Sequence, residues 1–310
     1  MFKKILSIFL IVSFAINIQA QETDTIKRIP KLYKTWMFYV PGITHFKEKR
    51  YAEGIFLSTL EIGGIATGII FNKDLKAENN STYYNFPLYI GLNALTVDKC
   101  DFFRNQLEFI KYQRPNFQYD PMTFKQLIVA PFMPKNIFTP ITGSFIALAL
   151  AELWLESRNA EFSYSKVNKM SFLNTYVDKN TGMAIYGAAS MAMSWEAGVG
   201  EEYIFRNWLM PILDYRLGQR KGLVISSAVF GGMHAVNYLF VENPDPVAML
   251  YQVGFTSIMG YVLGKNVQKN HYRIGKAIAA HAWYDFTLML GSFLVNPKEN
   301  VFGVNVTLKL

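Results

Sequence analysis

Long apolar runs separated by short polar linkers dominate the chain after residue 50. A helix that crosses a membrane needs about 20 mostly apolar residues, so the pattern predicts about six or seven membrane segments. The candidate segments are residues 54–71, 83–97, 137–155, 183–199 continuing into 201–213, 223–241, 247–264 and 274–295. The expected fold class is all-α, a polytopic transmembrane helical bundle.

The two ends of the chain follow other patterns. Lys3 and Lys4 precede an apolar run from Ile5 to Ile16, and Ala20 stands at a cleavage point, which predicts a signal peptide over 1–20. The alternative is an uncleaved N-terminal anchor. In the tail, 297–310, apolar residues alternate with polar ones, which predicts a short strand.

The distribution of long apolar runs suggests two regions. We expect a membrane-associated extension over 21–120 with one or two hydrophobic helices, and a denser helical core over 121–296. In the extension, Pro41-Gly42 precedes a glycine-rich apolar segment, which resembles the short membrane hairpin domains of bacterial proteins. The alternative is a simple turn before a helix.

The basic linkers indicate how the predicted segments are oriented in the membrane. The linkers 214–222 and 265–273 carry Lys and Arg, whereas 241–246 carries none, so the positive-inside rule places the first two in the cytoplasm. Counting the predicted membrane crossings backwards from these linkers toward the N-terminus also places residues 30–50 and 98–124 in the cytoplasm. That conflicts with a signal peptide, which would send 21–50 outside.

Composition narrows the class of protein. Hydrophobic residues make up 51% of the chain and charged residues 17%, which excludes a disordered chain. Cys100 is the single cysteine, which excludes a disulfide scaffold. The net charge of +8 lies mostly in the linkers, so we expect the partners to be the lipid bilayer and a peptide substrate, not nucleic acid. The expected location is a bacterial inner membrane.

Ionisable residues within apolar segments are costly and mark functional sites. Here they fall into three groups on three successive segments. The groups are Glu201, Glu202 and Arg206; Phe230 and His234; and His281 and Asp285.

The spacing within these groups has a direct physical meaning. Residues four apart share a helix face, so Glu202 can pair with Arg206, and His281 and Asp285 present one face. Glu201 is offset by about 100° and lacks that cation, which suits a general base. Phe230 shares a face with His234 and can line the pocket.

One carboxylate and two histidines permit two hydrolytic mechanisms. In one, Glu201, His234 and His281 hold a metal such as Zn²⁺, which activates water. In the other, Glu201 and His234 activate water directly, while His281 and Asp285 stabilise the oxyanion.

The ordered motifs Glu201-Glu202-Tyr-Ile-Phe-Arg206, Phe230-Gly-Gly-Met-His234 and His281-Ala-Trp-Tyr-Asp285 resemble the CPBP family of intramembrane proteases. That family includes the CAAX prenyl endopeptidases and the Abi proteins. The resemblance implies a multi-helix membrane protease with a catalytic cavity. It also implies the water-activating role for Glu201 and His234, by a metal-dependent or a metal-free mechanism.

Two other classes stay open. The chain can be a non-enzymatic membrane protein, a pseudoprotease or partner-binding scaffold that retains the motifs as a structural polar network, or a transporter with a proton relay. Glu61, Glu152 and Glu196 receive no role. His45 lies in a basic loop and His271 in a cationic linker, so we expect both to be solvated.

Overall fold

The computed structural model describes residues 30–71, 85–172, 175–240, 245–298, 300, 302 and 304–308, and in residues 239 and 240 only the backbone. Residues Lys31–Leu310 form one compact unit. The predicted signal peptide lies outside the described residues.

The described elements are mostly helices, which confirms the predicted all-α class. The α-helices are α2 (Ile43–Lys47), α3 (Tyr51–Ile70), α5 (Phe86–Asp98), α6 (Cys100–Gln113), α7 (Phe124–Val129), α8 (Pro134–Ile137), α9 (Pro140–Ser157), α10 (Lys179–Glu202), α11 (Met210–Leu217), α12 (Gln219–Met233), α13 (Pro246–Lys269) and α14 (Gly275–Val295). The 3₁₀ helices are η1 (Thr35–Tyr39), η2 (Ala130–Phe132), η3 (Tyr164–Lys166) and η5 (His234–Phe240), and η4 (Tyr203–Leu209) is a π-helix. The strands are β1 (Val167–Phe172), β2 (Thr175–Asp178) and β3 (Asn305–Leu308).

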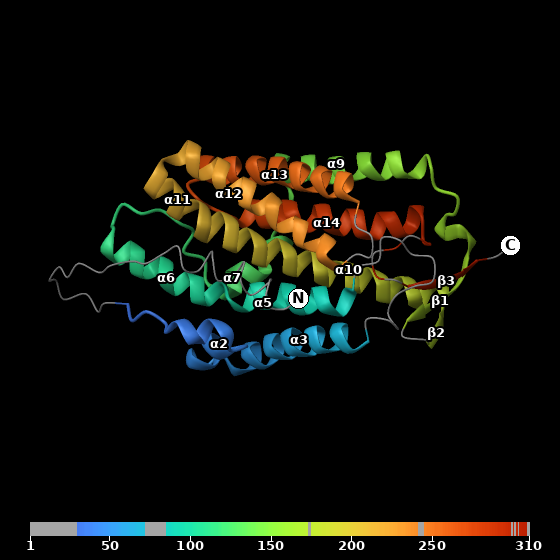
Figure 1. Cartoon of the computed structure of the whole chain (residues 1–310), viewed down its shortest axis with the longest axis horizontal. Coiled ribbons are helices and arrows are strands. Elements are labelled where there is room, and N and C mark those ends of the chain that lie inside the picture. Colours follow the sequence, from blue (N-terminus) through green and yellow to red (C-terminus); the bar gives the residue numbers. More distant parts are fainter. Residues whose placement is uncertain are drawn as a thin grey trace. The chain divides into compact units, whose positions relative to one another are not determined.

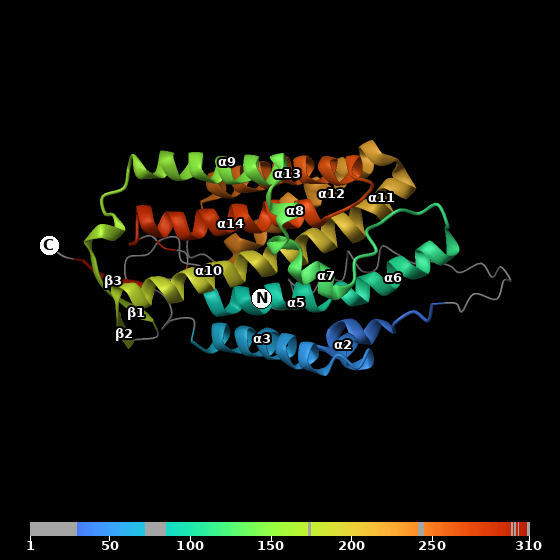
Figure 2. The same cartoon turned by 180° about the vertical axis from the view of Figure 1, so that it is seen from behind.

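The long helices lie side by side as a bundle (Figures 1 and 2). Helix α3 packs on α5, α5 on α10, α10 on α14, and α14 on α9, while α12 packs on α13. Helix α5 therefore joins the predicted extension to the helix that carries Glu201 and Glu202. The bundle brings the three motif-bearing segments together around the end of α10, because α10 packs on α14 and α12 packs on η4.

Three of the described helices are long and apolar enough to cross a membrane: α3, α13 and α14. Their outward faces carry large exposed apolar side chains, as on α3, where Ile55, Ile62 and Ile69 are 61, 58 and 60% exposed. An apolar surface of this extent matches lipid rather than water. The predicted segment 223–241 is shorter as a helix, because α12 ends at Met233 and a 3₁₀ helix begins at His234.

The four basic stretches of the sequence come together at one end of the bundle. The Gly42 N–H donates to both oxygens of Asp98, at 3.2 and 3.1 Å, which joins stretch 30–50 to stretch 98–124. The Tyr272 hydroxyl donates to Asp214 at 2.8 Å and joins the other two linkers. Asp120 Oδ2 accepts the N–H of Ile274 at 3.0 Å and links these two pairs, so all four stretches lie at the same end of the bundle. Their position relative to a membrane stays a prediction of the sequence.

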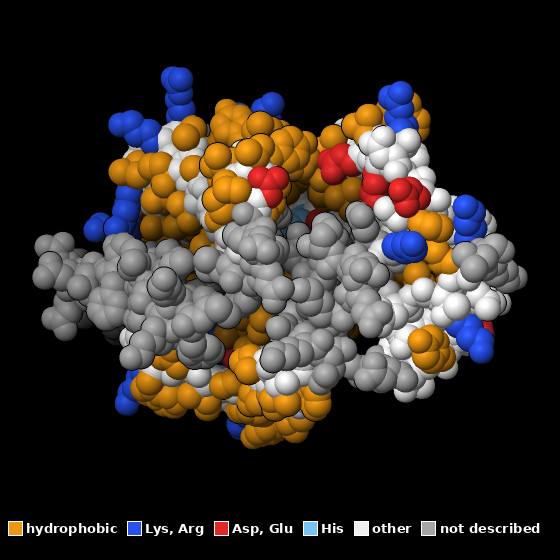
Figure 3. All heavy atoms as spheres, turned by 45° about the vertical axis from the view of Figure 1, so that its right-hand side comes forward, with side chains coloured by type: hydrophobic (Ala, Val, Ile, Leu, Met, Phe, Trp, Pro, Cys, Tyr) orange, Lys and Arg blue, Asp and Glu red, His pale blue; other side chains and the backbone are white. Residues whose placement is uncertain are grey.

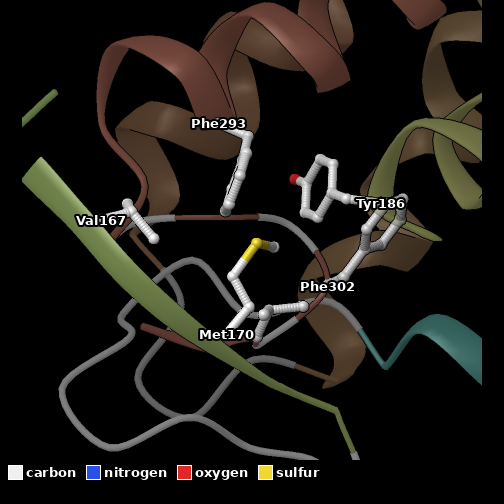
Figure 4. Close-up of a cluster of buried hydrophobic side chains, with 6 residues drawn as sticks. Val167, Met170, Tyr186, Phe293 and Phe302 are labelled. Carbon is white, nitrogen blue, oxygen red and sulfur yellow. The ribbon is translucent and has the colours of Figure 1, made fainter. Parts of the chain in front are cut away.

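The other end of the bundle carries a three-stranded sheet in the order β2-β1-β3. The predicted C-terminal strand exists as β3, which pairs antiparallel with β1, with Val306 opposite Met170. Behind the sheet, apolar side chains pack together, and the rings of Tyr186 and Phe293 stack with centroids 4.1 Å apart (Figure 4). This small core attaches the sheet to the ends of α10 and α14.

The expectation that His45 is solvated is wrong. Its side chain is fully buried, and its ring packs edge-on against Phe124 with centroids 4.6 Å apart. Its Nε2 lies 3.3 Å from Asp98 Oδ1, and its Nδ1 lies 3.6 Å from Asp101 Oδ2. Its Nδ1 also lies 3.5 Å from Oε2 of Glu53. Asp98 and Asp101 follow His45 by more than 50 residues, so no local pattern could show these two carboxylates. His271 is exposed, as expected.

Candidate active site

The first motif lies where an α-helix turns into a π-helix. Helix α10 ends at Glu202, and the π-helix η4 continues from Tyr203 to Leu209. Pro211 follows closely, and a proline inside a helix has no N–H for the carbonyl four residues earlier. A local π-turn is one way in which a helix absorbs that loss, and π-turns occur frequently at functional sites.

Glu202 and Arg206 form the ion pair that their spacing predicts. Nη1 of Arg206 lies 3.2 Å from Oε1 of Glu202, and both side chains are buried. The Arg206 guanidinium also lies over the ring of Phe230, 3.9 Å from its centroid. A cation over an aromatic face is stabilised by the ring quadrupole, so Phe230 helps to hold the buried charge.

His281 on α14 connects this pair to the third motif. Its Nδ1 donates to Oε1 of Glu202 at 2.8 Å, across 79 positions of the sequence. Its Nε2 faces Oδ2 of Asp285 at 3.3 Å and Oε2 of Glu201 at 3.9 Å. The imidazole therefore lies between Glu202 on one side and the carboxylates of Asp285 and Glu201 on the other.

His234 lies where α12 ends and η5 begins. Its Nδ1 lies 3.0 Å from the carbonyl oxygen of Phe230, an acceptor, so Nδ1 carries the proton and Nε2 is the unprotonated nitrogen of the neutral ring. The ring of Phe230 lies 4.8 Å from that of His234 and 6.0 Å from that of His281, edge-on to both. Phe230 thus contacts both histidines, as its predicted role in lining the pocket requires.

The two adjacent glutamates have different environments. The Glu202 side chain is fully buried, whereas that of Glu201 is 24% exposed. Oε2 of Glu201 has no hydrogen-bond partner. In Figure 3 a histidine side chain is visible in a hollow between hydrophobic side chains, on a face rich in such side chains. A carboxylate oxygen that accepts no hydrogen bond and lies 3.9 Å from a histidine nitrogen is able to take a proton from water.

The positions of Glu201, His234 and His281 can be compared with the predicted metal site. In the part of the chain that the structure describes, no three His, Cys, Asp or Glu side chains are arranged to hold a metal ion. Both nitrogens of His281 face carboxylate oxygens, and a ring that donates from both has no lone pair for a metal. The side chains as they lie do not fit a Glu201, His234 and His281 metal site.

Some site residues were not visible in the sequence. Asn207, directly after Arg206, is fully buried and hydrogen-bonds to the backbone of Asp120, which itself binds the backbone of Ile274. The only signal was a polar residue inside an apolar run. Glu196 is also buried, with no hydrogen-bond partner for its Oε2. Between the described residues, no hydrogen bond or ion pair joins His234 to Glu201.

Comparison with known proteins agrees with the motifs. A family model described as type II CAAX prenyl endopeptidase Rce1-like matches residues 185–287, about a third of the chain, and the match includes all three motifs. No curated protein and no solved structure matches the chain. The resemblance of the three motifs to the CPBP and CAAX proteases is thereby confirmed, and residues 185–287 of this helical membrane protein are similar to the type II CAAX prenyl endopeptidase Rce1-like family.

Proposed function

We propose that this chain is an endopeptidase of a bacterial inner membrane that hydrolyses a peptide bond within or beside the bilayer. Glu201 and His234 activate the water molecule. The observation that carries the proposal is the difference between the two adjacent glutamates. Glu202 is fully buried against Arg206 and His281, whereas Oε2 of Glu201 accepts no hydrogen bond and the Glu201 side chain is 24% exposed.

The arrangement supports a direct sequence of proton transfers. Glu201 accepts a proton from water as the water oxygen bonds to the peptide carbonyl carbon, and the unprotonated Nε2 of His234 orients that water. Nε2–H of His281, held toward the site by Asp285, donates to the oxygen that becomes negative. Glu201 then gives its proton to the leaving nitrogen as the C–N bond breaks, which yields one carboxylate and one amine.

The metal-dependent version stays a separate hypothesis. Zn²⁺ would lower the pKa of a bound water and polarise the peptide carbonyl. It would need Glu201, His234 and His281 to rearrange, because His281 is now held by carboxylates on both sides. The metal content of the purified protein, measured by mass spectrometry, separates the two versions.

The test compares two carboxylates on the same helix. Glu201→Gln removes the proposed base, whereas Glu196→Gln changes a buried carboxylate five positions earlier. Among the described residues, no hydrogen bond or ion pair joins Glu196 to the motif residues. We expect new protein N-termini, detected by N-terminal peptide labelling of cell membranes, to disappear in Glu201→Gln and in His234→Ala and to persist in Glu196→Gln.

One outcome contradicts the proposal. If Glu201→Gln and His234→Ala insert normally and the set of N-termini is unchanged, the chain is not a protease of this kind. The remaining interpretation is then a non-enzymatic scaffold, in which Glu202, Arg206 and His281 form a structural polar network. That interpretation predicts loss of stability in Arg206 variants and no change in any cleavage product.

A further inference from the structure

A buried polar contact outside the motifs joins the π-helix η4 to the start of α14. The side-chain amide of Asn207 pairs with the backbone of Asp120: the Asp120 N–H donates to Oδ1 at 2.7 Å, and Nδ2 donates to the Asp120 carbonyl at 3.0 Å. Oδ2 of Asp120 then accepts the N–H of Ile274 at 3.0 Å. We call these three residues the Asn207–Asp120–Ile274 clamp.

The clamp lies in the interior of the protein. Asn207 and Ile274 are 0% exposed and Asp120 is 3% exposed. Buried hydrogen bonds of this kind are expensive to leave unmade, because each freed group costs about 1–3 kcal/mol. The Asp120 carboxylate is also at the N-terminal end of α14, where a negative charge is favoured by the helix dipole. Ile274 offers no side-chain cap of its own, so Asp120 supplies it from another part of the chain.

Each end of the clamp lies close to a motif. Asn207 follows Glu202 by one turn of the π-helix, and Ile274 precedes His281 by seven residues, about 10 Å along α14. The 2.8 Å hydrogen bond between Glu202 and His281 joins α14 to the last residue of α10, which continues directly into η4. Two elements that are joined at two points cannot slide or rotate against each other freely. Catalytic groups need to be held within about 0.5 Å of their working geometry.

We propose that Asn207 and Asp120 are positioning residues that fix the register of α14 against η4, so that His281 stays aligned with Glu202 and faces Glu201. Neither residue touches the substrate. Asp120 lies in the loop before α7, on a segment of the chain remote from the motifs. The inference deepens the proposed protease function and depends on it for its effect on cleavage, although its effect on His281 does not.

The test reads the alignment of His281 directly. The chain has four histidines, so ¹⁵N-histidine labelling of the full-length protein in lipid bilayers gives four imidazoles to assign by solid-state NMR. The Nδ1 proton of His281, bound to Glu202, should resonate far downfield. We expect Asp120→Ala and Asn207→Ala to move it upfield and to slow formation of the product N-termini, by up to about 100-fold for a displacement near 1 Å.

The matched control removes a helix cap that serves no motif. Asp178 accepts the N–H groups of Asn180 and Thr181 at the start of α10, at the sheet end of the bundle. Asp178→Ala should lower the Tm, as loss of an N-cap does, and leave the His281 signal in place. A merely structural role for the clamp would make Asp120→Ala behave like Asp178→Ala.

Three outcomes separate the clamp from the protease function. If the folded Asp120→Ala and Asn207→Ala proteins keep the His281 signal and the cleavage rate while Glu201→Gln abolishes cleavage, the clamp is wrong and the function stands. If the His281 signal moves but Glu201→Gln leaves cleavage unchanged, the clamp stands and the function is wrong. If neither alanine variant folds, Asp120→Asn, a weaker neutral acceptor, should shift the signal less in the same direction, and an unchanged signal overturns the clamp.

Discussion

Two neighbouring glycines on α12 provide a sharp test of how closely the helices pack beside His234. A Cβ added to Gly231 would lie 2.5 Å from the carbonyl oxygen of Val253 and 2.8 Å from the backbone nitrogen of Ser257, both on α13. A Cβ added to Gly232 meets nothing within 4 Å. Gly231→Ala and Gly232→Ala are therefore the same chemical change in two different surroundings, three and two positions before His234.

The expected size of the effect follows from these distances. Contacts to Cβ atoms below 3.0 Å essentially do not occur, so α13 must retreat by at least the difference from 2.5 Å, which is 0.5 Å. Overpacking of this kind costs about 1–3 kcal/mol, against a gain of about 1 kcal/mol from replacing glycine by alanine in a helix. We expect Gly231→Ala to lose up to about 2 kcal/mol and Gly232→Ala to gain up to about 1 kcal/mol.

The single cysteine gives the assay. Cys100 is 1% exposed, and burial raises the pKa of its thiol well above the ordinary value, so a thiol-reactive dye reports unfolding. At about 2–4 °C per kcal/mol, the two variants should differ in Tm by several degrees. Gly231→Ala should also slow the formation of product N-termini. If the two alanines change Tm equally, α12 and α13 are not packed as closely as described.

Two further predictions use the same unfolding assay. Arg206→Met leaves the buried Glu202 without the Arg206 cation and should lower the free energy of unfolding by about 3–5 kcal/mol. The double variant Arg206→Met/Glu202→Gln should recover much of that loss. Equal stability of the single and double variants would contradict the ion pair. Burial raises the pKa of Glu48, but the Tyr33 hydroxyl and the Arg104 and Arg50 guanidinium groups outweigh it and hold the pKa below its ordinary value of 4.5. Because the pKa of Glu48 is lowered by folding, the stabilisation is complete above pH 4.5 and is lost as the pH falls through the lowered pKa. Tyr33→Phe should therefore reduce the loss of Tm on acidification. An unchanged dependence of Tm on pH would refute this role of Tyr33.

Much of the site was determined locally by the sequence. The pairs Glu202–Arg206 and His281–Asp285 could be predicted because residues four apart share one face of a helix, whatever the rest of the chain does. The apolar runs predicted the helices for a similar reason, since apolar length and periodicity act within a segment. The same reasoning found the C-terminal strand β3, but not its partner β1.

Only the tertiary structure determined the contacts between segments that are distant in the sequence. The hydrogen bond from His281 to Glu202 and the burial of His45 between Asp98 and Asp101 join residues that no local period relates. The sequence singled out two adjacent glutamates and already favoured Glu201 as the base. Packing against α14 shows what Glu202 does instead. Helical order follows from each segment's own residues, whereas the environment of a carboxylate depends on which neighbours the fold brings to it.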